Sequence, residues 1–167
     1  MMDLLQRISN YFQLKEAVVT NTGLDNTPND AQFANIKYVA IAYLDNLVVR
    51  LSKYLKHSVD FDISSWFRSK AVNEAPSVKG ADTSSHCKGL AVDINEKHMT
   101  TLELFQFILI NFEFDQLIYE KHGNKKWVHW GLEKKSKSKN FRKQIMVSTA
   151  TGKYQILTKQ EALALTA

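Results

Sequence analysis

The sequence predicts an α+β fold in which a small antiparallel sheet carries helices on one side. One long segment has the apolar spacing of an amphipathic helix, whereas several short segments alternate apolar and polar residues or flank turn signals. Helices and hairpins in this order are typical of α+β domains. With 167 residues, 44% of them hydrophobic and 23% charged, the chain is expected to form one domain over residues 1–167.

Two helices carry clear start signals. The first is expected from Thr27, a candidate cap, through Pro28 at the first helical position to about Leu55. Its apolar stripe consists of Phe33, Ile36, Val39, Ala40, Tyr43, Leu44, Leu47 and Val48. The second follows Thr100 and Glu103, which form a capping-box pattern before an apolar run.

Strands are expected at residues 61–67, 89–95, 114–120 and 127–132. The last two are joined by a turn at Gly123-Asn124, which places Glu120 opposite Trp127. The C-terminal part, residues 141–167, is expected to form a further hairpin around Thr151-Gly152. Thr158 with Glu161 then caps a short terminal helix.

Three residues have the character of metal ligands: His86, Asp93 and His129. Two histidines and a carboxylate on zinc leave one coordination position open for water, as in catalytic sites. Alternation along the strands supports their convergence. Asp93 lies opposite the apolar face of its strand, and His129 lies opposite the face of Val128 and Trp130.

Glu120 is the candidate general base, because the expected register makes it a diagonal neighbour of His129. His122 falls on the same side and is a candidate for stabilising a developing oxyanion, whereas His98 is a candidate for supporting the ligands. Cys87 has two interpretations, a soft fourth ligand or a small packed hydrophobe, and the second is favoured.

The motif Ser84-x-His86-x-x-Gly89-x-Ala91-x-Asp93, together with Trp127-x-His129, resembles the M15 family of zinc peptidases. This family includes D-Ala-D-Ala carboxypeptidases and phage L-alanyl-D-glutamate endolysins. The resemblance covers residues 12–145 and includes further segments at Phe12-x-Leu14, Asn26-Thr27-Pro28, Ile63–Ser69 with Asn73, and Phe114–Glu120.

The resemblance implies one zinc ion per chain on the three candidate ligands and Glu120 as the catalytic base. It also implies that Arg68 grips a substrate carboxylate or carbonyl and that Ser84 helps to orient the site. The fold implied is the one these peptidases share with the hedgehog signalling domain. Two positions depart from the family pattern: Trp66 replaces a usual glycine, and Lys126 stands where many relatives have the acid, so that role falls on Glu120.

The expected function is zinc-dependent hydrolysis of an amide bond in the peptidoglycan stem peptide, as a carboxypeptidase or an endopeptidase. A phage-encoded enzyme of cell-wall degradation is the favoured setting. The alternative is a non-catalytic, zinc-containing virion structural or binding protein on the same fold.

The net charge is +5, and basic residues gather late in the chain: Lys134, Lys135, Lys137, Lys139, Arg142 and Lys143. This stretch is interpreted as a solvated loop or as an attractor for anionic cell-wall polymers. Nucleic acid is disfavoured because aromatic residues do not interleave the charges. The start, Met1–Arg7, lacks a signal-peptide pattern, and no apolar run is long enough to span a bilayer. The chain is therefore expected in the host cytoplasm before release or on the virion, where phage proteins are further candidate partners.

Overall fold

The sheet of this protein has six strands in the order β1-β2-β4-β3-β5-β6. The computed structural model describes residues 3–134, 141–150 and 152–166. The combination of helices with this sheet confirms the α+β class. The sheet is nevertheless mixed rather than antiparallel, because β5 pairs with β3 in parallel. The antiparallel prediction was wrong at this point, since β5 does not return beside β4 but lies on the other side of β3.

Internal contacts divide the chain into two compact units, residues 1–59 with 63–92 and residues 60–62 with 93–167. A single domain over residues 1–167 stays a prediction.

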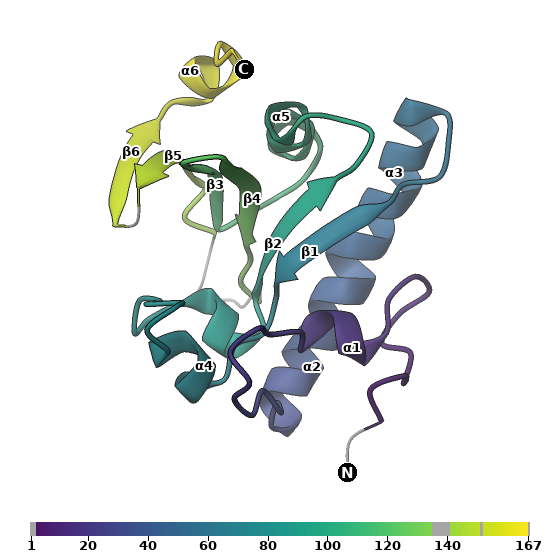
Figure 1. Ribbon diagram of the computed structural model, residues 1–167. Helices are drawn as coiled ribbons and strands as arrows, with labels where there is room; N and C mark the ends of the chain where they lie inside the picture. Colours follow the sequence, from purple (N-terminus) through teal and green to yellow (C-terminus); the bar gives the residue numbers. More distant parts are fainter. Residues whose placement is uncertain (1–2, 135–140, 151, 167) are drawn as a thin grey trace. The chain divides into compact units, whose positions relative to one another are not determined.

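The first unit is built on a long helical segment that Figure 1 shows as one continuous coil. It comprises α2 (Asp30–Val39), a π-helical turn (Ala40–Leu44) and α3 (Asp45–Leu55). The predicted helix is confirmed, but its cap is Asn29 rather than Thr27. The Asn29 side chain accepts from the Gln32 N–H at 2.9 Å and Gln32 Oε1 accepts from the Asn29 N–H at 2.8 Å. Asn29 thus satisfies the first free donors two residues later than predicted.

The first unit also holds three short helices that are too brief to show periodicity in the sequence. They are α1 (Leu14–Ala17), α4 (Lys70–Glu74) and the 3-10 turn η2 (Ser85–Lys88). Strands β1 (Phe61–Ser65) and β2 (Ala91–Glu96) run from one unit into the other along the chain. The largest fully buried side chains of this unit are Ile8, Leu14, Ile36, Leu44, Leu47, Leu51, Trp66 and Phe67.

The second unit contains the hairpin of β3 (Gln116–His122) and β4 (Lys125–Gly131). Its register pairs Glu120 with Trp127, as predicted. Gly123 has φ +61°, a value that suits glycine at the first position of a two-residue hairpin loop. Helix α5 (Thr101–Asn111) carries the predicted capping box and packs on both strands of this hairpin.

Beyond this hairpin, β5 (Gln144–Ala150) and β6 (Lys153–Leu157) form the predicted C-terminal hairpin, followed by α6 (Lys159–Leu163) with its Thr158 cap. The start of β5 is tied to the start of β3, because the Arg142 side chain donates to Asp115 Oδ2 from Nε at 2.8 Å. Lys135, Lys137 and Lys139 of the basic stretch lie outside the described residues. Within the described residues, no helix has the length and apolar character needed to cross a membrane.

Candidate metal centre and neighbouring glutamate

Asp93 of β2 and His129 of β4 form a direct contact in the second unit. Asp93 Oδ1 lies 2.9 Å from His129 Nδ1, and Asp93 is only 5% exposed. A hydrogen bond from the Asn95 side chain to the Lys126 carbonyl, 2.7 Å long, joins the same two strands. The other ring nitrogen, His129 Nε2, would lie 3.3 Å from a Cβ at Gly131. Glycine at 131 therefore leaves space for a ring that turns Nδ1 towards Asp93.

His86 lies in the first unit, on the 3-10 turn η2, and is 2% exposed. Its Nδ1 lies 2.6 Å from the Trp66 carbonyl oxygen. A carbonyl can only accept, so Nδ1 carries the hydrogen and Nε2 presents its lone pair. A backbone carbonyl on the second nitrogen is the usual support for a histidine that binds a metal.

Gly89 ends the η2 turn with φ +72°. A Cβ at this position would lie 2.9 Å from Ile36 Cγ1 and 3.0 Å from the Gln32 carbonyl oxygen, both on α2. Glycine is therefore required twice, for the left-handed backbone and for the close approach of the helix. Gly89 thus permits the bend after His86.

His86, Asp93 and His129 make up the group of described side chains that could hold a metal ion. Two imidazoles and one carboxylate suit zinc with an open coordination position. Cys87 is not a member of this group. Burial raises the pKa of its thiol, against the lowering effect of the Arg68 charge, and a protonated thiol is a poor metal ligand.

Glu120 is buried in the second unit, with 6% of its surface exposed. Its Oε2 lies 2.9 Å from His122 Nε2, which is the distance of an ion pair, although the geometry falls short of a hydrogen bond. Burial raises the pKa of Glu120, and the positive charges of His129 and His122 oppose this rise. A carboxyl group that gains protons more readily than usual is suited to act as a general base.

Arg68 and Ser84 were expected to contact substrate and orient the site. Arg68 donates from Nε to Ser65 Oγ at 2.8 Å, and its backbone N–H donates to the His86 carbonyl at 3.2 Å. The Ser84 carbonyl accepts from the Cys87 N–H at the start of η2. Both residues thus flank the turn that carries His86, and their predicted roles stay predictions.

The side chain of Trp66 is fully buried. It meets Phe12 edge to face, with ring centroids 6.1 Å apart. Its indole is therefore part of the core of the first unit, while its carbonyl supports His86.

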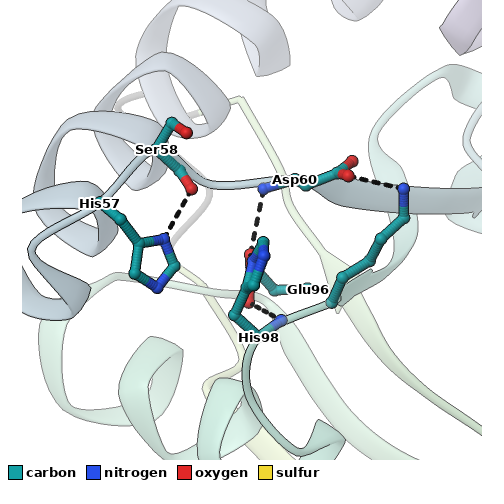
Figure 2. Close-up of polar contacts among 6 residues, drawn as sticks. His57, Ser58, Asp60, Glu96 and His98 are labelled. Atoms are coloured by element: carbon teal, nitrogen blue, oxygen red, sulfur yellow. Dashed lines mark hydrogen bonds and ion pairs between the residues drawn. The ribbon is translucent and has the colours of Figure 1, made fainter.

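His98 lies beyond the end of β2, where its Nδ1 is 2.8 Å from Glu96 Oε1 (Figure 2). Glu96 also accepts from the backbone N–H groups of Asp60 and His98, and Lys97 pairs with Asp60. These contacts secure the chain around Glu96. The predicted support of the metal ligands by His98 stays a prediction.

The position of Ser148 on β5 beside Glu120 was not predicted from the sequence. Ser148 pairs with Glu120 in the parallel register, is 1% exposed and lies 3.1 Å from His122 Nε2 through its Oγ. A lone serine in a strand carries no local signal of this role.

The chain offers two histidines and a carboxylate that could hold a metal, and it also buries a glutamate of raised pKa. These groups are the ones that a metal-dependent hydrolase uses. The family model for Peptidase M15 matches residues 10–131. The chain therefore belongs to the M15 peptidase family, as the sequence motifs indicated. A search of curated proteins gave no match.

Proposed function

We propose that this protein is a zinc-dependent peptidase that hydrolyses an amide bond in the stem peptide of bacterial peptidoglycan. The observation that carries the proposal is the contact of Asp93 with His129 beside the buried Glu120, in a chain of the M15 family. One zinc ion per chain would be held by His86, Asp93 and His129. Bound there, zinc would supply a Lewis acid that acidifies water and polarises the carbonyl to be cleaved.

Glu120 would take a proton from the attacking water and return it to the leaving amine. Its raised pKa supports the first step, because the carboxylate gains a proton more readily than an ordinary glutamate does. Arg68 would anchor a carboxylate or carbonyl of the substrate, since a guanidinium can bind both oxygens of a carboxylate at once. Ser84 would orient the turn that holds His86.

A cell-wall substrate agrees with the net charge of +5, because positive charge attracts anionic wall polymers. Arg142, however, forms an ion pair with Asp115. Association with a phage, and the choice between carboxypeptidase and endopeptidase, are further parts of the proposal.

The proposal is tested by digesting purified peptidoglycan with the zinc-loaded protein and its Glu120→Gln variant. We expect new amino termini from the wild type and a loss of at least about a hundredfold in the variant, as for removal of a general base. Glu113→Gln is the matched control, because Glu113 is exposed and lies on the approach to the same strand. Equal rates for wild type and Glu120→Gln would exclude Glu120 as the base.

The alternative, a zinc-containing virion or binding protein without activity, predicts a different result. Such a protein would retain zinc and release no product from any peptidoglycan fragment.

A further inference from the structure

The C-terminal hairpin lies beyond the segment that matches the family, residues 10–131, yet it reaches the catalytic base proposed above. Strand β5 runs parallel to β3 and places Ser148 beside Glu120 as its Cα partner. Ser148 is 1% exposed, so its hydroxyl must be satisfied inside the protein. The hairpin therefore brings a buried polar group to Glu120 from outside the shared family segment.

Ser148 is aimed by an irregularity in its own strand. The pairing of β5 with β6 shifts register between Ser148 and Ala150. Ser148 Oγ donates to the Ala150 carbonyl at 3.0 Å across this shift. Bulges of this kind often redirect a side chain next to an active site.

Ser148 and Glu120 meet at one nitrogen of His122. His122 Nε2 lies 3.1 Å from Ser148 Oγ and 2.9 Å from Glu120 Oε2. The one hydroxyl hydrogen of Ser148 points to an acceptor, so its Oγ has lone pairs left for a donor. An ionised Glu120 only accepts. The contact with Ser148 Oγ therefore requires a hydrogen on His122 Nε2, and the ion-pair distance to an ionised Glu120 favours the same hydrogen.

The His122 ring is held from a second side by Trp127, with ring centroids 4.9 Å apart and planes at 70°. Trp127 is also the cross-strand partner of Glu120 in the β3–β4 hairpin. The imidazole is thus fixed by an aromatic ring from β4 and a hydroxyl from β5.

We infer that Ser148 and His122 are positioning residues for Glu120, so that the C-terminal hairpin β5–β6 is part of the active site. This inference rests on the proposed function for the role of Glu120. Ser148 contacts the Glu120 carboxyl group and also fixes the His122 ring with Nε2 protonated, and His122 Nε2 lies against the same carboxyl group. The ordering of a general base in this way acts mainly on the chemical step.

The test compares Ser148→Ala with Thr149→Ala, since Thr149 is the exposed neighbour on the same strand. On zinc-loaded protein, we expect Ser148→Ala to lower kcat about tenfold with KM unchanged, as for loss of one hydrogen bond in a charged network. Thr149→Ala should behave as wild type. The losses from Ser148→Ala and His122→Ala should be less than additive in the double variant His122→Ala/Ser148→Ala, because both side chains contact the same Glu120 carboxyl group. Additive losses in this cycle would overturn the inference.

A second measurement does not depend on activity. Histidine side-chain ¹H–¹⁵N spectra of the wild type should show His122 as the Nε2–H tautomer, and Ser148→Ala should shift that resonance. An unchanged His122 spectrum in Ser148→Ala would overturn the inference even in an active enzyme. A wild type that shows the tautomer and the shift but hydrolyses nothing would instead refute the proposed function.

Discussion

Asp93 and His129 contact each other directly, with Oδ1 and Nδ1 2.9 Å apart. Side chains from two different strands therefore meet at a carboxylate oxygen and an imidazole nitrogen, which are atom types that zinc can bind. A carboxylate and an imidazole placed this close before metal binding need little rearrangement to become ligands.

Replacement of Asp93 tests the metal centre. Asp93→Asn keeps the shape of the side chain but removes its charge, so zinc affinity should fall by more than the ~10–100-fold that loss of a supporting contact costs. Zinc per chain is measured by mass spectrometry after dialysis. Asp62→Asn is the control, because Asp62 is an exposed carboxylate on β1. Retention of zinc by Asp93→Asn would exclude Asp93 as a ligand.

The turn that carries His86 depends on glycine at position 89. Gly89→Ala should lower the free energy of unfolding by about 1–2 kcal/mol for the left-handed backbone. The collision with α2 should add about 1–3 kcal/mol. Zinc affinity should fall as well, because the turn cannot be kept in place.

Gly23→Ala is the matched control for this substitution. Gly23 also has φ +72°, but a Cβ there would have no atom within 4 Å. Gly23→Ala should therefore lower the free energy of unfolding only by the cost of the left-handed backbone, and it should leave zinc binding unchanged. Equal thermal shifts for the two variants would contradict the close packing described at Gly89.

Glu120 should destabilise the metal-free protein at neutral pH. Burial raises its pKa, opposed by the charges of His129 and His122, so the folded state holds the proton more tightly than the unfolded chain does. The stability of the folded state is then lost as pH rises from the pKa of Glu120 in the unfolded chain through its pKa in the folded protein. Glu120→Gln should therefore unfold at a higher temperature than wild type at pH 7 in the presence of a chelator. The difference should shrink as pH falls towards the unfolded pKa of about 4.3 and vanish well below it, where the carboxyl group is neutral in both the folded and the unfolded state. If Glu120→Gln were less stable than wild type at pH 7, a raised pKa of Glu120 in the folded protein would be contradicted.

Glu96 should show the opposite dependence. Burial alone would raise its pKa, but hydrogen bonds from Asp60 and His98, with the charge of His98, bring it below the ordinary value. The stabilisation is then present above the unfolded pKa and is lost as pH falls. Glu96→Gln should cost about 1.5–3 kcal/mol of unfolding free energy at pH 7, the usual value of hydrogen bonds to a charged group. The loss should shrink in acid, as followed by denaturant unfolding at both pH values.

The register of the β3–β4 hairpin could be predicted because two residues, Gly123 and Asn124, fix how the strands pair. The alternation of apolar and polar residues along β2 and β4 then predicted that Asp93 and His129 lie on the face opposite the apolar side chains of their strands. The 3-10 turn that carries His86 was too short to recognise.

The position of β5 could not be predicted in the same way. No local pattern shows that the strand after β4 passes to the far side of β3, so the parallel pairing and the contact of Ser148 with His122 were missed. The cap at Asn29 was misplaced because Thr27-Pro28 is an equally good start signal. The contacts of His98 with Glu96 depend on a backbone turn that side-chain pattern does not reveal.

The most direct test of the central claim follows peptidoglycan digestion together with the metal content of the same sample. Protein stripped by a chelator and then reloaded with zinc is compared with His129→Ala, and products are identified by mass spectrometry. We predict one zinc per chain, a defined peptide product that stops on chelation and returns with zinc, and neither in His129→Ala. Full zinc occupancy without any product, or product that persists without metal, would contradict the assignment as a zinc peptidase.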